Sequence, residues 1–213
     1  MPEGEEMFEI VKPMDIEKRS FEIITEILGD RKFPQEHESI VKRVIHTTAD
    51  FDYADNLVFS EGVVEKILEA LKKGCDIVTD TQMAKSGINK NILGKLGGEV
   101  HCFMSDGDVA EEAKARGITR AAVSMEKAAT LTKPCIFAIG NAPTALIAFD
   151  ELMKAGKLNP VAIIGVPVGF VNVVESKELI IDSGAPHIVA RGRKGGSNVA
   201  AAICNALLYK ITR

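Results

Sequence analysis

The segment RVIHTTAD (43–50) carries a side chain that could transfer protons. His46 follows an apolar helical pattern and precedes two threonines and an aspartate, and Ser20, beside Lys18 and Arg19, lies on the preceding predicted helix. A lone histidine beside an apolar helix face is more often structural. Its ordinary pKa of about 6.5 also suits it to donate and recover a proton near neutrality. Both interpretations remain open for His46.

Two further segments are suited to binding anions. GNAPTAL (140–146) places Asn141 and Thr144 around a proline that fits the first turn of a helix. The unpaired N–H groups of a helix start attract anions, although capping alone would explain this segment equally well.

The segment RGRKGGSNVAAA (191–202) gives a stronger signal for phosphate or carboxylate. It joins basic side chains to glycines and a serine at a predicted helix start, and we expect contacts from Arg191, Lys194, Gly195, Gly196 and Ser197. Arg193 adds a third cation. The segment is not a P-loop, because GxxxxGK[ST] is absent, and GVPVGF (165–170) does not match GxGxxG. A nucleotide-dependent enzyme is therefore poorly supported.

Composition bounds the class of protein. The 213 residues predict a single domain (1–213), and 46% hydrophobic with 26% charged residues is an ordinary soluble balance. The net charge of −4 argues against a nucleic-acid partner. The acidic first 15 residues have no apolar core, and no apolar run approaches the ~20 residues needed to cross a bilayer, so we expect no membrane association and a cytoplasmic location. Four dispersed cysteines and four dispersed histidines predict buried thiols and no protein-built metal site.

Periodicity predicts the elements that position these segments. Helices are expected from Pro13 to a stop at Gly29, over 34–47, and from an N-cap at Ser60 to the lysines before Gly74. About five short apolar strands then alternate with helices, within 75–81, 99–106, 135–143, 161–169 and 187–196. This pattern predicts an α/β fold, a mostly parallel sheet covered on both faces, with the N-terminal helices added. The polar segments follow the strands, where ligands of such sheets bind.

Taken together, these segments resemble one family. RSFEII (19–24), RVIHTTAD, TDTQM (79–83), GNAPTAL, GVPVGFVNVVESK (165–177) and GRKGGSNVAAAICNAL (192–207) are similar, in order, to the precorrin-8X methylmutases, including the cobalt-precorrin-8 methylmutases of cobalamin biosynthesis. The similarity runs from about residue 7 to residue 210. The GNAPTAL, PVGFVNVVESK and GRKGGS blocks are long and unusual, which makes the similarity highly specific.

The resemblance implies a Rossmann-like three-layer α/β/α fold and an isomerase. A methyl group moves from C-11 to C-12 of ring C in a corrin precursor, giving hydrogenobyrinate or, with cobalt, cobyrinate. It implies no added cofactor, since any cobalt is carried within the tetrapyrrole substrate, and a homodimer with the site near the interface. It also implies His46 as proton donor and acceptor, with Ser20 and Arg120 contacting substrate. The lean toward the cobalt-containing substrate rests on overall similarity.

The substrate implied is a flat apolar macrocycle rimmed with carboxylates, so an acidic protein must gather cations and N–H donors locally. Asp80 and Glu175 suit such a site only if they orient an arginine or a histidine. Lys194 stands where the family need not be basic. The alternative is a carrier that binds a tetrapyrrole without chemistry, which would have no need of an acid at His46.

Overall fold

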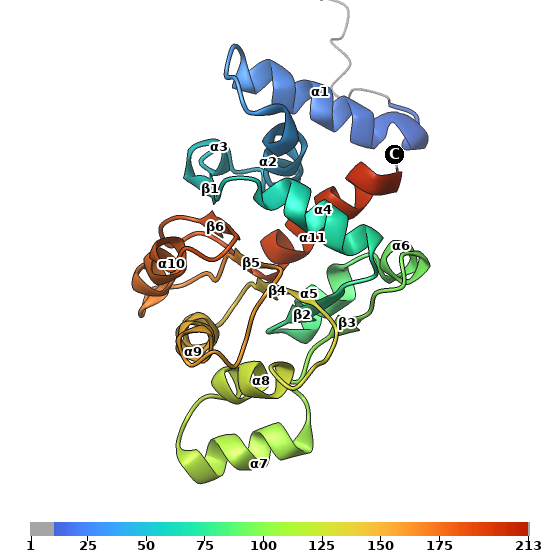
Figure 1. Cartoon of the computed structure of the whole chain (residues 1–213). Coiled ribbons are helices and arrows are strands. Elements are labelled where there is room, and N and C mark those ends of the chain that lie inside the picture. Colours follow the sequence, from blue (N-terminus) through green and yellow to red (C-terminus); the bar gives the residue numbers. More distant parts are fainter. Residues whose placement is uncertain (1–10, 213) are drawn as a thin grey trace, which may run out of the picture.

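A computed structural model describes residues 11–212 as helices on both faces of a six-stranded sheet (Figure 1). The strand order is β1-β6-β5-β4-β2-β3, and every neighbouring pair is parallel except β1 with β6. The strands are β1 (Leu57–Phe59), β2 (Asp76–Thr79), β3 (Val100–His101), β4 (Cys135–Ile139), β5 (Ala162–Gly165) and β6 (His187–Ala190).

One face of the sheet is covered by the N-terminal and C-terminal helices. The helices in contact with this core are α2 (Gln35–Thr48), α4 (Val63–Lys72), α5 (Gln82–Gly87), α6 (Lys90–Lys95) and α11 (Ser197–Thr212). The 3-10 turn η1 (Pro13–Asp15) leads into α1 (Ile16–Leu28), which packs on α2 as an outer layer, and α3 (Tyr53–Asn56) precedes β1.

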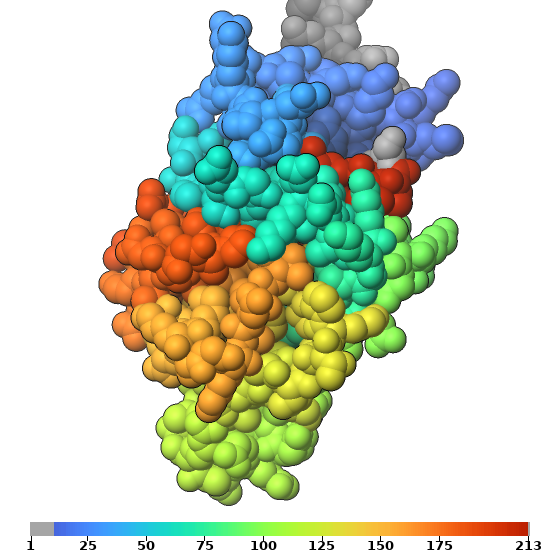
Figure 2. Space-filling model, in the orientation of Figure 1, coloured from blue at the N-terminus to red at the C-terminus, as the bar shows by residue number. Residues whose placement is uncertain are grey.

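The other face is covered by α8 (Arg120–Ala128), α9 (Pro143–Lys154) and α10 (Val173–Asp182), and α7 (Gly107–Arg116) packs outside α8. The molecule is therefore elongated, with α1 at one end and α7 at the other (Figures 1 and 2).

Strand residues alternate between the two cores. In β4, Ile136 and Ala138 join the core beneath α2 and α11, whereas Phe137 and Ile139 join the core beneath α8 and α9. A strand buried on both faces must be apolar throughout, which is the pattern seen in the sequence. The predicted α/β class and its five parallel strands are confirmed. Strand β1 was not predicted, because three half-buried residues give no clear period.

The helix boundaries also test particular predictions. Gly29 caps α1 with φ +58°, and Pro143 occupies the first turn of α9, as expected. The N-cap prediction at Ser60 is wrong: α4 begins after Gly62, and the Ser60 hydroxyl accepts a hydrogen bond from the His187 amide at 2.8 Å. Ser60 thus joins β1 to β6 instead of capping a helix.

The four cysteines are buried, as predicted. No helix among residues 11–212 is long and apolar enough to cross a membrane.

Candidate active site

The loops that follow β4, β5 and β6 pack backbone against backbone at the carboxyl edge of the sheet, where the parallel strands end. A Cβ at Gly140 would lie 2.7 Å from the Ser197 Cα, and a Cβ at Gly195 would lie 2.1 Å from the Val166 oxygen. Both distances are shorter than real Cβ contacts, so these positions require glycine. Gly195, which was predicted to contact a ligand, and Gly140 therefore let three loops meet.

Asp80 fixes the loop after β4. Its carboxylate is fully buried and accepts hydrogen bonds from the amides of Gly140 (2.9 Å), Asn141 (2.8 Å) and Ala142 (2.7 Å). Burial raises the pKa of the Asp80 carboxyl, and the three N–H donors act in the opposite direction. The role left open for Asp80, to orient an arginine or a histidine, is not the one found, because the partners of its carboxylate are backbone amides.

This contact changes the interpretation of GNAPTAL. Strands β2 and β4 are neighbours in the sheet. The chain continues from β2 to β3 on one side and from β4 to β5 on the other. Open α/β sheets bind ligands at such a reversal of strand order. Three amides that could have met an anion there already hold the Asp80 carboxylate. The Asn141 side chain remains exposed, but its amide is occupied.

Two hydroxyl contacts bring further loops to this edge. The Thr81 Oγ1 lies 2.7 Å from the Ser197 Oγ, which joins the loop after β2 to the start of α11. The Thr119 hydroxyl donates to the Thr144 hydroxyl at 2.9 Å, which joins the start of α8 to α9. Arg120 follows directly, with an exposed side chain. The contact to Thr144 comes from Thr119, and the Arg120 side chain borders a hollow that it shares with Glu111 and Lys114 of α7.

The basic loop (residues 191–196) exposes three cations in different electrostatic states. Arg191 makes two hydrogen bonds of 2.9 Å to the Glu178 carboxylate, which raises its pKa. Lys194 lies between two other carboxylates, described below. Arg193 is exposed and makes no ion pair with any residue in the described range. Within this loop, the two cations predicted to bind substrate are Arg191 and Lys194, and each already faces a carboxylate.

Lys194 joins the basic loop to the end of α2. Its Nζ lies 2.6 Å from a carboxylate oxygen of Asp50 and 2.6 Å from one of Asp52. These hydrogen bonds raise the pKa of Lys194 and lower that of Asp50. Since Asp50 follows His46 by four residues, the bridge connects the predicted acid to the predicted anion site.

His46 lies in the last turn of α2 with an exposed imidazole. Its ring stacks on Phe21 of α1, with centroids 5.2 Å apart and planes inclined by 13°. The Arg43 guanidinium lies 4.7 Å from the same Phe21 ring and forms an ion pair with Glu17. Phe21 therefore orients the imidazole. The neighbouring Ser20 hydroxyl donates to the Ile16 carbonyl within α1 at 2.9 Å.

Lys177 is a site residue that was not predicted. Its side chain is fully buried, and its Nζ donates to the carbonyls of Gly192 (2.7 Å) and Lys194 (2.8 Å) beneath the basic loop. Burial lowers its pKa to about 8. The signal was a lysine on the helix face that also carries Val173 and Ile180. Glu175 is exposed in the first turn of α10, where a carboxylate suits the helix dipole.

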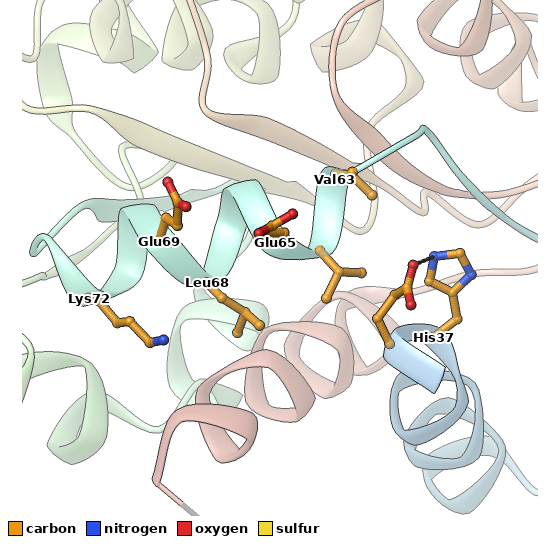
Figure 3. A pocket seen from close by; sticks show the side chains of 9 residues that line it. His37, Val63, Glu65, Leu68, Glu69 and Lys72 are labelled. Atoms are coloured by element: carbon orange, nitrogen blue, oxygen red, sulfur yellow. Dashed lines mark ion pairs between the residues drawn. The ribbon is translucent and has the colours of Figure 1, made fainter. Parts of the chain in front are cut away.

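A separate pocket of about 440 Å³ lies near the opposite end of α2 (Figure 3). His37 lines it, stacked on Phe59 at 3.9 Å, and burial lowers the His37 pKa. Carboxylates of Glu36, Glu65 and Glu69 also line this pocket, which makes it unsuitable for an anionic ligand. No predicted site residue borders it. Across residues 11–212, no three His, Cys, Asp or Glu side chains cluster closely enough to hold a metal ion.

Comparison with known proteins identifies the family. The model of the precorrin-8X methylmutase family matches residues 15–210. The chain belongs to this family. A cobalt-precorrin-8 methylmutase from Salmonella typhimurium is 48% identical over 211 residues, covering 96% of this chain and 99% of that protein. A precorrin-8X methylmutase from Pseudomonas aeruginosa is 38% identical, covering 90% and 93%.

Solved structures agree with this assignment. The precorrin-8X methylmutase from Thermus thermophilus superposes with a TM-score of 0.85 at 36% identity, covering 93% of this chain and 98% of that one. A precorrin-8X methylmutase related protein gives a TM-score of 0.81 at 31% identity, covering 89% and 99%. The resemblance in the sequence is confirmed, and with it the class: a methylmutase, which is an isomerase that moves a methyl group within one molecule.

Proposed function

We propose that the protein converts cobalt-precorrin-8 to cobyrinate by moving a methyl group from C-11 to C-12 of ring C. The lean toward the cobalt-containing substrate is supported by the 48% identical Salmonella typhimurium protein, which carries that name. The metal-free substrate would react in the same way, since the methyl shift needs no metal redox step. No cofactor of the protein's own enters the proposal.

His46 is the proposed acid. Protonation of the conjugated ring system draws electron density toward the protonated atom and eases migration of the methyl group with its bonding pair. The reaction is an isomerisation, so the proton returns to His46 when the ring is neutral again. Positioned acid catalysis of this kind contributes about 10²–10⁴-fold. The stacking of the imidazole on Phe21 supports a fixed orientation for the donor nitrogen.

Substrate binding needs an apolar surface beside polar donors. Val168, Phe170 and Val171, in the loop after β5, are 48%, 85% and 79% exposed. The Gly169 amide donates to the Arg193 carbonyl at 3.2 Å, so this apolar segment lies against the basic loop. We place the flat face of the macrocycle on these side chains and its carboxylates on the basic loop, with Arg120, Asn141 and Thr144 at the other side.

We also propose a homodimer with the site near its interface. On α1, Ile16, Ile23 and Ile27 share one face and are 53%, 36% and 61% exposed. Ser20 lies on that same face and precedes Phe21, whose ring stacks on the imidazole of His46. An exposed apolar stripe on the helix whose Phe21 contacts the proposed acid is suited to a second copy of the chain.

The observation that carries the proposal is the Lys194 bridge to Asp50 and Asp52, which ties the helix end bearing His46 to the basic loop. The test is an anaerobic visible-absorption time course of the purified protein with cobalt-precorrin-8, with the product identified by mass and NMR. Conversion to an isomer methylated at C-12 supports the proposal. Binding without conversion would contradict it and favour a tetrapyrrole carrier.

A further inference from the structure

Lys177 is a fully buried cation with no carboxylate partner in the described part of the chain. Its two hydrogen-bond acceptors are backbone carbonyls of the basic loop, those of Gly192 and Lys194. The nearby Glu178 carboxylate binds Arg191 instead. An ammonium group held only by neutral carbonyls is costly to bury, because it loses its hydration without gaining an opposite charge. Folding alone therefore does not explain the lysine.

The geometry of the peptide bond shows what the lysine does. In a planar trans peptide the C=O and the following N–H point in opposite directions. Because the carbonyls of Gly192 and Lys194 point toward Lys177, the amides of Arg193 and Gly195 point away from it. Neither amide donates a hydrogen bond within the described range, whereas the Gly196 amide is bonded to the Val166 carbonyl.

On the outer side of the basic loop, some polar groups have partners in the described part of the chain and others do not. Its Arg191 and Lys194 side chains face carboxylates of this chain, while the Arg193 guanidinium and two amides do not. The Arg193 and Gly195 amides are two positions apart, and N–H groups that point to the same side of a loop can both donate to one carboxylate. Such a site recognises a carboxylate by hydrogen bonds of fixed direction and needs little charge of its own.

We propose that Lys177 is a positioning residue that holds the Gly192 and Lys194 carbonyls on the inner side of the basic loop and so presents the amides of Arg193 and Gly195 to a peripheral carboxylate of the substrate. The inference rests on the proposed function for the identity of the ligand. Lys177 itself does not touch the ligand.

The test compares Lys177→Met with the wild type by absorbance titration of two corrins. Cobyrinate carries free peripheral carboxylates, and its fully amidated counterpart does not. The variant is expected to bind cobyrinate about tenfold more weakly than the wild type does. The two proteins should bind the fully amidated corrin equally well. With cobalt-precorrin-8 the substitution should raise KM about tenfold while kcat stays within about twofold. Ile67→Val, in α4 on the far side of the core, controls for a general loss of packing.

Equal affinity of Lys177→Met and wild type for cobyrinate would overturn the proposal. Equal weakening for both corrins would also overturn it, because that result indicates a merely structural role. If Lys177→Met does not fold, Lys177→Leu, which also lacks a donor, replaces it in the same comparison. The titrations do not depend on turnover. A wild type that binds but never isomerises its substrate would refute the proposed function, and the titrations could still be interpreted.

Discussion

The Lys194 ammonium lies 2.6 Å from the Asp50 carboxylate, although 144 positions separate the two residues in sequence. This ion pair and the second one, between Lys194 and Asp52, hold the turn after α2 against the basic loop. The lysine was expected to bind substrate. That role stays a prediction, and from its position between two carboxylates we propose that Lys194 also sets the position of the helix end bearing His46.

Removing this bridge should affect catalysis more than stability. Lys194→Met is expected to lower kcat about tenfold, because small misplacements of catalytic groups are costly, while an exposed ion pair contributes about 0–1 kcal/mol to folding. Asp50→Asn combined with Asp52→Asn should give a similar loss, and the triple variant should lose no more. Steady-state kinetics test this, with Lys73→Met as control, because Lys73 is an exposed lysine that follows α4 and pairs with Glu69. Additive losses would show that Lys194 acts separately from Asp50 and Asp52.

Asp80 should be a major determinant of stability. In Asp80→Asn one carboxylate oxygen becomes an NH₂ group that faces backbone N–H donors, so at least one buried donor loses its partner. We expect the free energy of unfolding in urea to fall by about 3 kcal/mol. Asp30→Asn, at an exposed position, should change it little. If the two variants unfold at the same urea concentration, the buried carboxylate does not hold the loop after β4.

Lys177 predicts a particular pH dependence of stability. Burial lowers its pKa from 10.5 to about 8, so between these values the unfolded chain binds more protons than the native one, and stability contributed by this group rises with pH. The free-energy cost of burying the charged ammonium is fully present below pH 8. Between pH 8 and 10.5 the unfolding free energy of the wild type should rise relative to Lys177→Met by about 3 kcal/mol. Parallel pH profiles for the two proteins would show that the lysine is not desolvated.

The exposed stripe on α1 predicts the dimer surface. Ile23→Glu should convert a dimer to a monomer in sedimentation velocity, because a charge would be buried against apolar residues of the second copy. Ile118→Glu is the matched control, since Ile118 is 37% exposed and Ile23 is 36% exposed. A wild type that sediments as a monomer would refute the homodimer itself, and a dimeric Ile23→Glu variant would place the interface elsewhere.

The parallel sheet could be predicted from sequence because its strands are buried on both faces and therefore read as continuous apolar runs. Residues 135–139 illustrate this, since every side chain in that strand is buried. The position of the anion loops followed from the same pattern. Helix ends at Gly29 and Pro143 were predictable because their backbone requirements are local.

The partners of the site residues could not be predicted in this way. Lys194 pairs with Asp50 and Asp52, and Asp80 with the amide of Ala142, through contacts between distant segments that no local pattern encodes. A carboxylate that accepts backbone hydrogen bonds looks, in sequence, like any acid beside a ligand loop. Lys177 was detectable as a lysine among apolar helix positions, but its acceptors depend on the fold.

His46 as the acid of the methyl shift is the central claim, and one comparison tests it most directly. Wild type, His46→Ala and His37→Ala, which alters a histidine on the same helix outside the proposed site, are each followed anaerobically by visible absorption with cobalt-precorrin-8, with binding measured in parallel. We predict that His46→Ala binds as the wild type does and turns over about 10²–10⁴-fold more slowly, while His37→Ala matches the wild type. Turnover of His46→Ala at the wild-type rate would contradict the mechanism.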